Sequence, residues 1–553
     1  MKNIPISIFA FVYCALCFSC SLVQAAKASR DEVSNPAAYI PPQCYTKTKD
    51  ASGRVHNPCF TCHSDSPRPN MVNDSDLQLA YLFPDLARKN HWVNLFKDRR
   101  AEVAAISDTE IDRYISQSNY LAKNGDIVPA KTLRENAGAW DFNGDGKWGG
   151  FIPDAYFKFD KQGFDHRPDG TYSGWRSYAY YPLPGTFWPT NGSTDDVMIR
   201  LPAEFRQDET GRDNIQVYIV NLAIVEALIR KRTIAIDTID EHEIGSVDID
   251  KNGSIGPADR VVYDWAPLQQ RQMSYVGRAA LRQREGKVHL AAGLFPEGTE
   301  FMHSVRYISL DAKGNNHLSP RMKELRYARK THWMSYADLE RENHAEIKEA
   351  HDFPERLRVI HGNIEAGVSN GQGWVYAGMI ENAKGQLRPQ SYEELSFCVG
   401  CHGGAGQSRD GVVSFHRKLD DDSFQHAWFH WSQKDLRGVK ERRRPDGAGE
   451  YSYYLEQNGA GDEFRRNTEL ETKFFDQNGV LKSAALARMQ RDIAYLLYAS
   501  PARARELNKA YKLIVQEQSF VDGRDATVTA ADNVYVDTEG EVATGILSPL
   551  TAW

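Results

Sequence analysis

The chain has 553 residues, of which 41% are hydrophobic, 11% aromatic and 25% charged. This globular composition excludes disordered, collagen-like and disulfide-scaffold proteins. At roughly 150 residues per domain, the length favours two to four domains. The formal net charge of −7 offers no basic surface for a polyanion, so we expect no nucleic acid among the partners.

Residues 1–25 are typical of a secretory signal peptide. A basic Lys2 precedes an apolar run from Ile4 to Leu22, and small residues at Val23–Ala26 follow it. An uncleaved membrane anchor and lipidation of Cys20 are the two alternatives. We expect a periplasmic, outer-surface or secreted protein. The later apolar run Ile215–Ile229 is too short and too polar to cross a bilayer, so we predict no membrane span in the mature chain.

Residues 26–140 form the first predicted region of the mature chain. Residues 26–70 are rich in Pro, Ser and Asn, which predicts an extended loop, and they contain the sequence Cys-Phe-Thr-Cys-His at 59–63. Leucines between Leu77 and Leu86 have helical spacing, and Ser107 with Glu110 forms a capping-box pattern that predicts a helix start.

Residues 141–385 form a middle region with a different texture. Glycine and aromatic residues predict short strands, for example at Trp175–Tyr181 and Val305–Ile308. The apolar stretch 215–231 predicts a buried helix, and the charged stretch 319–358 predicts a further helix.

Residues 386–553 form the last predicted region, which we expect to be mostly helical. A capping box, Ser391 with Glu394, predicts a short helix that leads into the sequence Cys-Val-Gly-Cys-His at 398–402. Further helices are predicted over 484–498 and from Pro501 to Val515. The expected fold class is therefore α+β, with mainly helical N- and C-terminal regions around the two cysteine motifs and a loop- and strand-rich middle.

The segments 59–63 and 398–402 share the pattern C-x-x-C-H, which is the attachment sequence of haem c. Two thiols at this spacing reach the two vinyl groups of one haem, and the adjacent histidine ligates the iron. One alternative is a thioredoxin-like redox pair, but such a pair does not require a histidine after the second cysteine. The other is half of a zinc site, but such a site would need further Cys or His ligands at metal spacing. We therefore predict two covalently bound haem c groups. Their predicted binding residues are Cys59, Cys62, His63, Cys398, Cys401 and His402.

With an export signal and two such motifs, the sequence resembles the bacterial periplasmic c-type cytochromes that carry two haems. The resemblance covers the two motifs and the leader. It implies haem-bearing regions at 26–140 and 386–553, electron transfer, and redox partner proteins in the periplasm or the membrane. The alternative is a dihaem oxidoreductase with one open catalytic haem, peroxidase-like or oxidising sulfur compounds. Whether the chain is an enzyme stays open at this point.

The second axial ligand of each iron decides between electron transfer and catalysis, because an open iron position permits substrate chemistry. The sequence offers several candidates, and one of them is the odd thiol of the mature chain, whose alternative role is that of a plain buried cysteine. The candidates are Cys44, His56, Met71, His91, His416, His426 and His430. His426 and His430 are spaced to share one face of a helix.

Two acidic loops have the spacing of EF-hand calcium ligands. In the first loop the predicted ligands are Asp248, Asp250, Asn252, Ser254 and Asp259. In the second loop they are Asp141, Asn143, Asp145 and Lys147, but position 12 is Ile152, so Asp154 or a distant acid would have to close that site. An Asx-rich surface turn is the alternative for either loop. We predict one or two structural Ca²⁺ ions.

Overall fold

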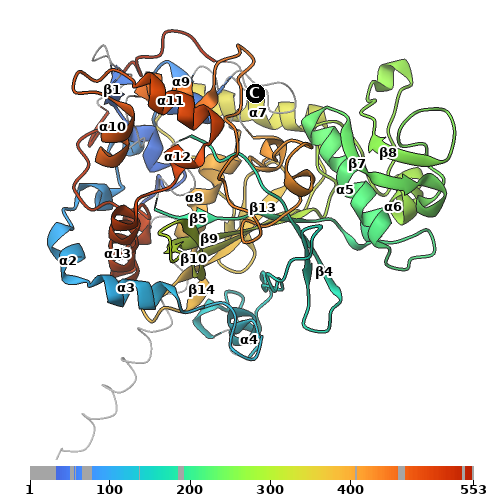
Figure 1. The fold of residues 1–553 in the computed structure, drawn as a ribbon, viewed down its shortest axis with the longest axis horizontal. Helices are drawn as coiled ribbons and strands as arrows, with labels where there is room; N and C mark the ends of the chain where they lie inside the picture. The colour runs from blue at the N-terminus through green and yellow to red at the C-terminus, as the bar shows by residue number, and fades with distance from the viewer. Residues whose placement is uncertain are drawn as a thin grey trace, which may run out of the picture.

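The computed structural model describes residues 33–49, 55–56, 58–64, 77–135, 138–184, 192–404, 406, 408–458, 467–538 and 542–550. The predicted signal peptide with Cys20, and the candidate ligand Met71, lie outside these residues. Figure 1 shows a central sheet with helices above it, below it and at its left end, and a lobe at its right end. That lobe contains helices α5 (Ile215–Arg230) and α6 (Gly277–Arg284) and the hairpin of β7 (Ile234–Asp240) and β8 (Pro257–Val261).

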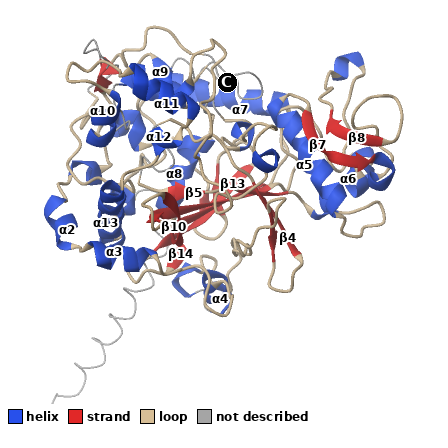
Figure 2. Ribbon diagram, in the orientation of Figure 1, coloured by secondary structure: helices blue, strands red, loops and turns tan. Residues whose placement is uncertain are grey.

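The centre of the molecule is a ten-stranded antiparallel sheet, red in the middle of Figure 2. Its main path runs β11-β12-β13-β10-β9-β6-β4-β3, with β14 paired to β13 and β5 paired to β9. The strands are β3 (Phe164–His166), β4 (Tyr172–Ser177), β5 (Thr194–Asp195), β6 (Met198–Arg200), β9 (Glu300–Leu310), β10 (Asn316–Lys330), β11 (Gly362–Asn363), β12 (Gly367–Ser369), β13 (Trp374–Glu381) and β14 (Leu387–Pro389). The short strands β1 (Thr48–Lys49) and β2 (Val55–His56) pair with each other.

Strand β10 corrects the prediction of a helix over 319–358. It pairs along one edge with β9 and along the other with β13, and only the second part of the segment is helical, as α7 (Tyr336–Asp352). The charged residues of β10 are typical of a solvent-exposed helix, and the sequence was interpreted in that way. Several of these residues are in fact buried, and their charges are paired with carboxylates. Arg321 contacts Glu381 at 2.6 Å and is one example. Paired charges inside a sheet are not distinguishable from surface charges by composition.

The remaining helices cover the sheet and its ends. They are α1 (Asp85–Arg88), α2 (Arg100–Ala105), α3 (Asp108–Ile115), α4 (Val128–Glu135), α8 (Tyr392–His402), α9 (Glu450–Asn458), α10 (Thr468–Phe474), α11 (Ser483–Arg491), α12 (Ala494–Leu497) and α13 (Pro501–Glu517). The predicted buried helix is confirmed as α5, and the helix that begins at Pro501 is confirmed as α13. The predicted helix over 484–498 is two helices, because Asp492 is extended and ends α11.

The expected fold class is wrong in its main feature. The chain is built on a large antiparallel sheet with helices around it, and it does not consist of mainly helical motif-bearing termini around a strand-rich middle. The described part of residues 26–140 contains short helices and the two short strands β1 and β2 among turns, and α2 and α3 pack against the distant α13. The terminal segments are thus held by packing on the rest of the chain, which local periodicity does not reveal.

Candidate functional site: a cavity between the two cysteine motifs

The first C-x-x-C-H segment lies on a short 3-10 helix, Pro58–Thr61. The carbonyl of Cys59 accepts hydrogen bonds from the amides of Cys62 at 3.0 Å and His63 at 2.7 Å, so the segment is a tight turn. The hydroxyl of Thr61 donates to the carbonyl of Pro58 at 2.9 Å and closes the same turn. These bonds place the two thiols and the imidazole on one compact piece of backbone.

The second C-x-x-C-H segment ends helix α8, which begins at the predicted capping box. Ser391 accepts a hydrogen bond from the amide of Glu394 at 3.2 Å, and the Glu394 carboxylate accepts one from the amide of Ser391 at 2.7 Å. Arg388 holds Glu394 at 2.8 Å. The helix is packed through Leu395, Cys398 and Val399 into the largest buried apolar cluster of the described chain.

The two motif segments lie against each other in space although they are far apart in the sequence. A Cβ atom on Gly400 would lie 2.0 Å from the carbonyl oxygen of Tyr39, so α8 touches the backbone of the N-terminal segment. A Cβ on Gly406 would lie 2.2 Å from the carbonyl oxygen of Ser64, the residue after His63. Both glycines are required by these close approaches of backbone to backbone.

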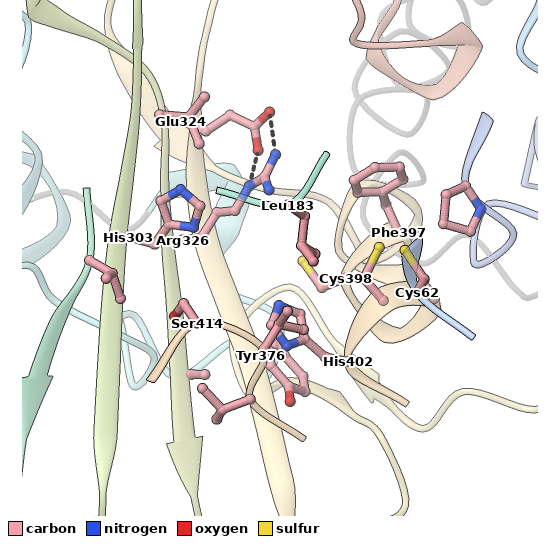
Figure 3. A pocket seen from close by; sticks show the side chains of 18 of the residues that line it. Cys62, Leu183, His303, Glu324, Arg326, Tyr376, Phe397, Cys398, His402 and Ser414 are labelled. Atoms are coloured by element: carbon pink, nitrogen blue, oxygen red, sulfur yellow. Dashed lines mark hydrogen bonds and ion pairs between the residues drawn. The ribbon is translucent and has the colours of Figure 1, made fainter. Parts of the chain in front are cut away.

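A large cavity opens between the two motifs, with a volume of about 1840 Å³ when the space toward solvent is counted. Its wall includes Cys62 and His63 from the first motif and Cys398, Cys401 and His402 from the second. Figure 3 shows the sulfur atoms of Cys62 and Cys398 facing each other beside His402. The described part of the chain contains five cysteines, Cys44, Cys59, Cys62, Cys398 and Cys401.

His402 is held in one orientation by its surroundings. Its Nδ1 donates a hydrogen bond to the carbonyl of Gly411 at 2.7 Å, and its ring stacks on that of Tyr376 with 4.9 Å between centroids. The Tyr376 hydroxyl donates to the same carbonyl at 3.0 Å. A histidine whose Nδ1–H is bound to a carbonyl presents unprotonated Nε2, and metal-ligating histidines commonly have this arrangement.

Burial also sets the protonation of the motif side chains. Loss of solvent lowers the pKa of His63 and of His402 to about 4, so both imidazoles are neutral at pH 7. Burial raises the pKa of Cys59 and Cys401, so these thiols keep their protons at pH 7. Neutral imidazole is the form that ligates a metal.

The structure separates the candidate axial ligands. Cys44 lines the cavity, and burial together with the charges of Cys59 and Cys62 raises the pKa of its thiol. His91 is on the surface, where its Nε2 bonds the carbonyl of Leu86 at 2.9 Å. His416 is buried, where burial and then the charge of Arg409 lower its pKa, and it does not line the cavity. The side chain of His56 lies outside the described residues.

His426 and His430 do not share a helical face. Their segment forms only a 3-10 turn, Phe424–Ala427, with Gln425, His426 and Ala427 at positive φ. His426 bonds the carbonyl of Asp421 at 2.9 Å. Both ring nitrogens of His430 are engaged, Nε2 with Asp196 at 2.8 Å and Nδ1 with the Ser432 hydroxyl at 2.7 Å. Neither histidine lines the cavity.

Sequence reasoning missed the polar residues on the sheet side of the cavity. His303 on β9 and Arg326 on β10 lie directly opposite each other in the register of the two strands and both line the cavity. No motif marks them. Alternation along β9 and β10 could have placed them on one face, but β10 carried the pattern of a charged helix.

The first acidic loop brings part of its predicted ligand set together. Oxygen atoms of Asp248, Asp250 and the buried Glu241 lie within 4.8 Å of one another. Glu241 accepts hydrogen bonds from the amides of Ile249 at 2.7 Å and Gly256 at 3.1 Å. Asp259, the predicted closing ligand, is instead held by the adjacent Arg260 at 2.6 Å. Glu241, which precedes the loop, therefore lies beside the two aspartates, and the role of Asp259 as a ligand stays a prediction.

Within the same loop, Asn252 and Ser254 stay beside the two aspartates. The Asn252 amide donates to Asp248 at 3.2 Å, and the Ser254 amide donates to the Asn252 side chain at 2.8 Å.

The second acidic loop folds as a tight turn around Asp141. This carboxylate accepts the amides of Gly144 and Gly146, each at 2.7 Å. Asp145 in turn accepts the amide of Lys147 at 2.8 Å. The carboxylate of Asp154, one predicted closing ligand, accepts hydrogen bonds from Arg200 at 2.6 Å and from the indole of Trp175 at 2.7 Å. The other predicted alternative was an acid from a distant part of the chain. Glu365 is such an acid beside this loop, and its carboxylate accepts a hydrogen bond from the amide of Gly149.

Comparison with known proteins points to lipoproteins. A family model described as "-like lipoprotein" matches residues 28–491. An "Uncharacterized lipoprotein" of Aquifex aeolicus (strain VF5) is 29% identical over 589 aligned residues, which cover 93% of this chain and 90% of the relative. No solved structure matches the chain. None of the helices in the described residues is long and apolar enough to cross a membrane.

These findings correct the family resemblance that the motifs suggested. The assignment to the periplasmic c-type cytochromes is wrong, because the matching family and the matching relative are described as lipoproteins and neither description indicates a cytochrome. The comparisons likewise give no support to cytochrome, haem or electron transport as a description of the family. Two short motifs and a leader cover too little of the chain to define its ancestry.

Proposed function

The chain belongs to this lipoprotein family, and from that premise we propose that it is an exported, lipid-anchored electron-transfer protein with two covalently attached haems in its cavity. The observation that carries the proposal is the meeting of two C-x-x-C-H segments, distant in the sequence, at the wall of one cavity. Two C-x-x-C-H patterns that arose by chance would not be expected to line the same cavity.

The residues present fit the proposed groups. Cys59 with Cys62, and Cys398 with Cys401, would each hold one haem by two thioether bonds, and His63 and His402 would each ligate an iron. The fixed Nδ1–H bond of His402 to Gly411 leaves Nε2 as the ligating atom. When bound, the groups supply one-electron oxidation and reduction.

The chain itself supplies a dry and rigid surrounding for this chemistry. Phe301, Val305, Tyr376, Phe397 and Val412 line the cavity with apolar surface. Such a wall excludes water and strengthens the interactions of the polar groups that remain inside. Side chains locked by packing change little when charge moves, which favours electron transfer between closely placed sites.

The proposal is tested by the haem content of the purified protein in a pyridine-haemochrome assay. We expect two haems per wild-type chain and one in the Cys398→Ser/Cys401→Ser variant. The control is Cys44→Ser, which removes a thiol that also lines the cavity but belongs to neither motif. The Cys44→Ser variant should keep two haems. In a redox titration, the number of electrons taken up by each of the three proteins should match its number of haems. A haem-free wild-type chain would overturn the proposal.

The alternative is a dihaem oxidoreductase with an open position on one iron. The observation that favours it is the pair His303 and Arg326 in the cavity wall, which is more polar than an electron carrier requires. Low-temperature EPR separates the two: two low-spin ferric signals support the carrier, and a persistent high-spin signal supports the enzyme.

We also propose structural calcium at the first acidic loop. Carboxylate and amide oxygens of Asp248, Asp250, Asn252 and Glu241 provide the hard ligands that Ca²⁺ prefers. Bound metal would stabilise the folded loop by mass action. The second loop lacks a comparable cluster among the described residues, so its calcium site stays a weaker prediction.

The membrane anchor in this proposal is a lipid on Cys20. This thiol follows Ser19 near the end of the apolar leader, so cleavage before it would make it the first residue of the mature chain. Each buried methylene of a lipid chain adds about 0.8 kcal/mol of membrane affinity.

A further inference from the structure

The sheet side of the cavity is built from alternate residues of two neighbouring strands. Phe301, His303 and Val305 of β9 and Glu324, Arg326 and Ala328 of β10 all line it. His303 and Arg326 are direct partners in the antiparallel register, so their side chains leave the same face of the sheet next to each other. Figure 3 shows both side chains on this floor, at a distance from the cysteine sulfurs.

Arg326 brings positive charge to this floor. Its Nε and Nη2 atoms donate to Glu324 at 2.9 and 3.3 Å, and Glu324 also accepts a hydrogen bond from Arg524 at 2.9 Å. Two guanidinium groups thus share one carboxylate, and the group of three has net positive charge. No described residue accepts a hydrogen bond from Nη1 of Arg326, whose side chain is 25% exposed.

His303 is oriented by a buried carboxylate behind it. Its Nε2 lies 3.3 Å from Oδ2 of Asp195, whose Oδ1 accepts a hydrogen bond from Tyr180. The Asp195 side chain is 3% exposed and that of His303 is 22% exposed. A carboxylate in contact with one ring nitrogen restricts the orientation of the imidazole.

We propose that Arg326 and His303 form a binding site for an oxyanion group. Guanidinium hydrogens match the planar oxygens of carboxylates and related oxyanions, and the apolar walls strengthen the attraction. The group would belong either to a carboxylate of an attached haem or to a small free oxyanion the size of nitrite. The inference rests on the proposed function only for the first of these sources.

The experiment titrates sodium nitrite into the purified, haem-loaded protein by isothermal calorimetry and records the haem spectrum of each variant. For a free oxyanion, nitrite binds the wild type, and Arg326→Gln weakens binding about 10- to 100-fold. His303→Gln weakens it less. The matched control is Arg329→Gln, an exposed arginine of the same strand that does not line the cavity. It should bind like the wild type.

If the oxyanion group is a haem carboxylate, titration of the wild type with nitrite releases no heat. The Arg326→Gln variant then retains two haems, but its haem absorption bands or reduction potentials are shifted. No nitrite binding together with unchanged haem properties in both Arg326→Gln and His303→Gln would overturn the inference. Haem content measured in the same samples separates the two proposals. A haem-free protein whose nitrite binding requires Arg326 refutes the haems and supports the oxyanion site.

Discussion

Glu241 and Glu365 contact the two acidic loops from outside, and each accepts the amide of the glycine at position nine of its loop, Gly256 or Gly149. The loop spacing was visible in the sequence, but neither glutamate could be assigned to it. Glu241 lies on the turn before its loop, and Glu365 is far along the chain beside β12. Only folding brings these carboxylates to the loops.

At the first loop this predicts which acid matters for calcium. Glu241→Gln should weaken Ca²⁺ binding at least tenfold, because one of the few charged ligands becomes neutral. Asp259→Asn should leave the affinity unchanged, since Asp259 is held by Arg260. For the measurement, calcium is first removed with a chelator and then added back, and the rise in melting temperature is recorded at each calcium concentration. Loss of calcium binding in Asp259→Asn with full binding in Glu241→Gln would contradict the geometry.

The cavity residues also differ in how far they were predictable. The thiols and histidines of 59–63 and 398–402 carry a spacing signal, the repeated C-x-x-C-H pattern, that is visible in the sequence alone. His303 and Arg326 have no such signal, since their proximity arises from the β9–β10 register. Their roles follow only once both strands are known.

Helix α8 shows what local sequence can specify. Its capping box and its approach to the second motif were predicted, because caps and periodicity act within one turn, whereas its continuation through the motif to His402 was not. Helix α5 was predicted for the same reason. Strand β10 was not, because its buried charges are neutralised by residues such as Glu381 from other strands. Long-range pairing decides the structure there.

The packing of α8 on the N-terminal segment is testable at Gly400. In Gly400→Ala, the new Cβ would meet the Tyr39 carbonyl, and backbone must shift to relieve the clash. We expect the free energy of unfolding to fall by about 1–3 kcal/mol. The control is Gly256→Ala without calcium, where a Cβ meets open space and φ is not positive. Urea denaturation measures both. Equal stability of both variants and the wild type would contradict the close approach of α8 to the backbone of Tyr39.

At the scale of the whole molecule, the sheet gathers strands from residue 164 to residue 389, and helix α8 with the second motif packs against β12 and β13. Composition predicted a large globular protein, and the leader predicted export, which agrees with a lipoprotein family. The order of the ten strands was not predictable from the chain alone. The proposed division into regions at 26–140, 141–385 and 386–553 stays a prediction.

Buried carboxylates make stability depend on acid pH. Burial alone would raise the pKa of Asp196 and Glu324, but His430 and Arg306 lower that of Asp196 to about 2, and Arg326 and Arg524 lower that of Glu324 to about 2. In the unfolded chain these two carboxyl groups have ordinary pKa values of about 4, so they bind protons at a higher pH than in the folded protein. The stability contributed by each group is therefore present above about pH 4 and lost as pH falls toward 2, on the order of 2 kcal/mol each.

Urea unfolding between pH 5 and pH 2.5 checks this expectation. The free energy of unfolding should fall with the pH, and Asp196→Asn should reduce the slope. The exposed Asp126 provides a control, since Asp126→Asn should keep the wild-type slope. A stability that stays constant over this range would contradict the assigned charges.

The most direct measurement of the central claim is the intact mass of the mature protein under denaturing conditions, followed by the masses of the peptides that contain 59–63 and 398–402. We predict a chain heavier by two haems, with one on each peptide. Unmodified cysteines, or a disulfide within either motif, would contradict it.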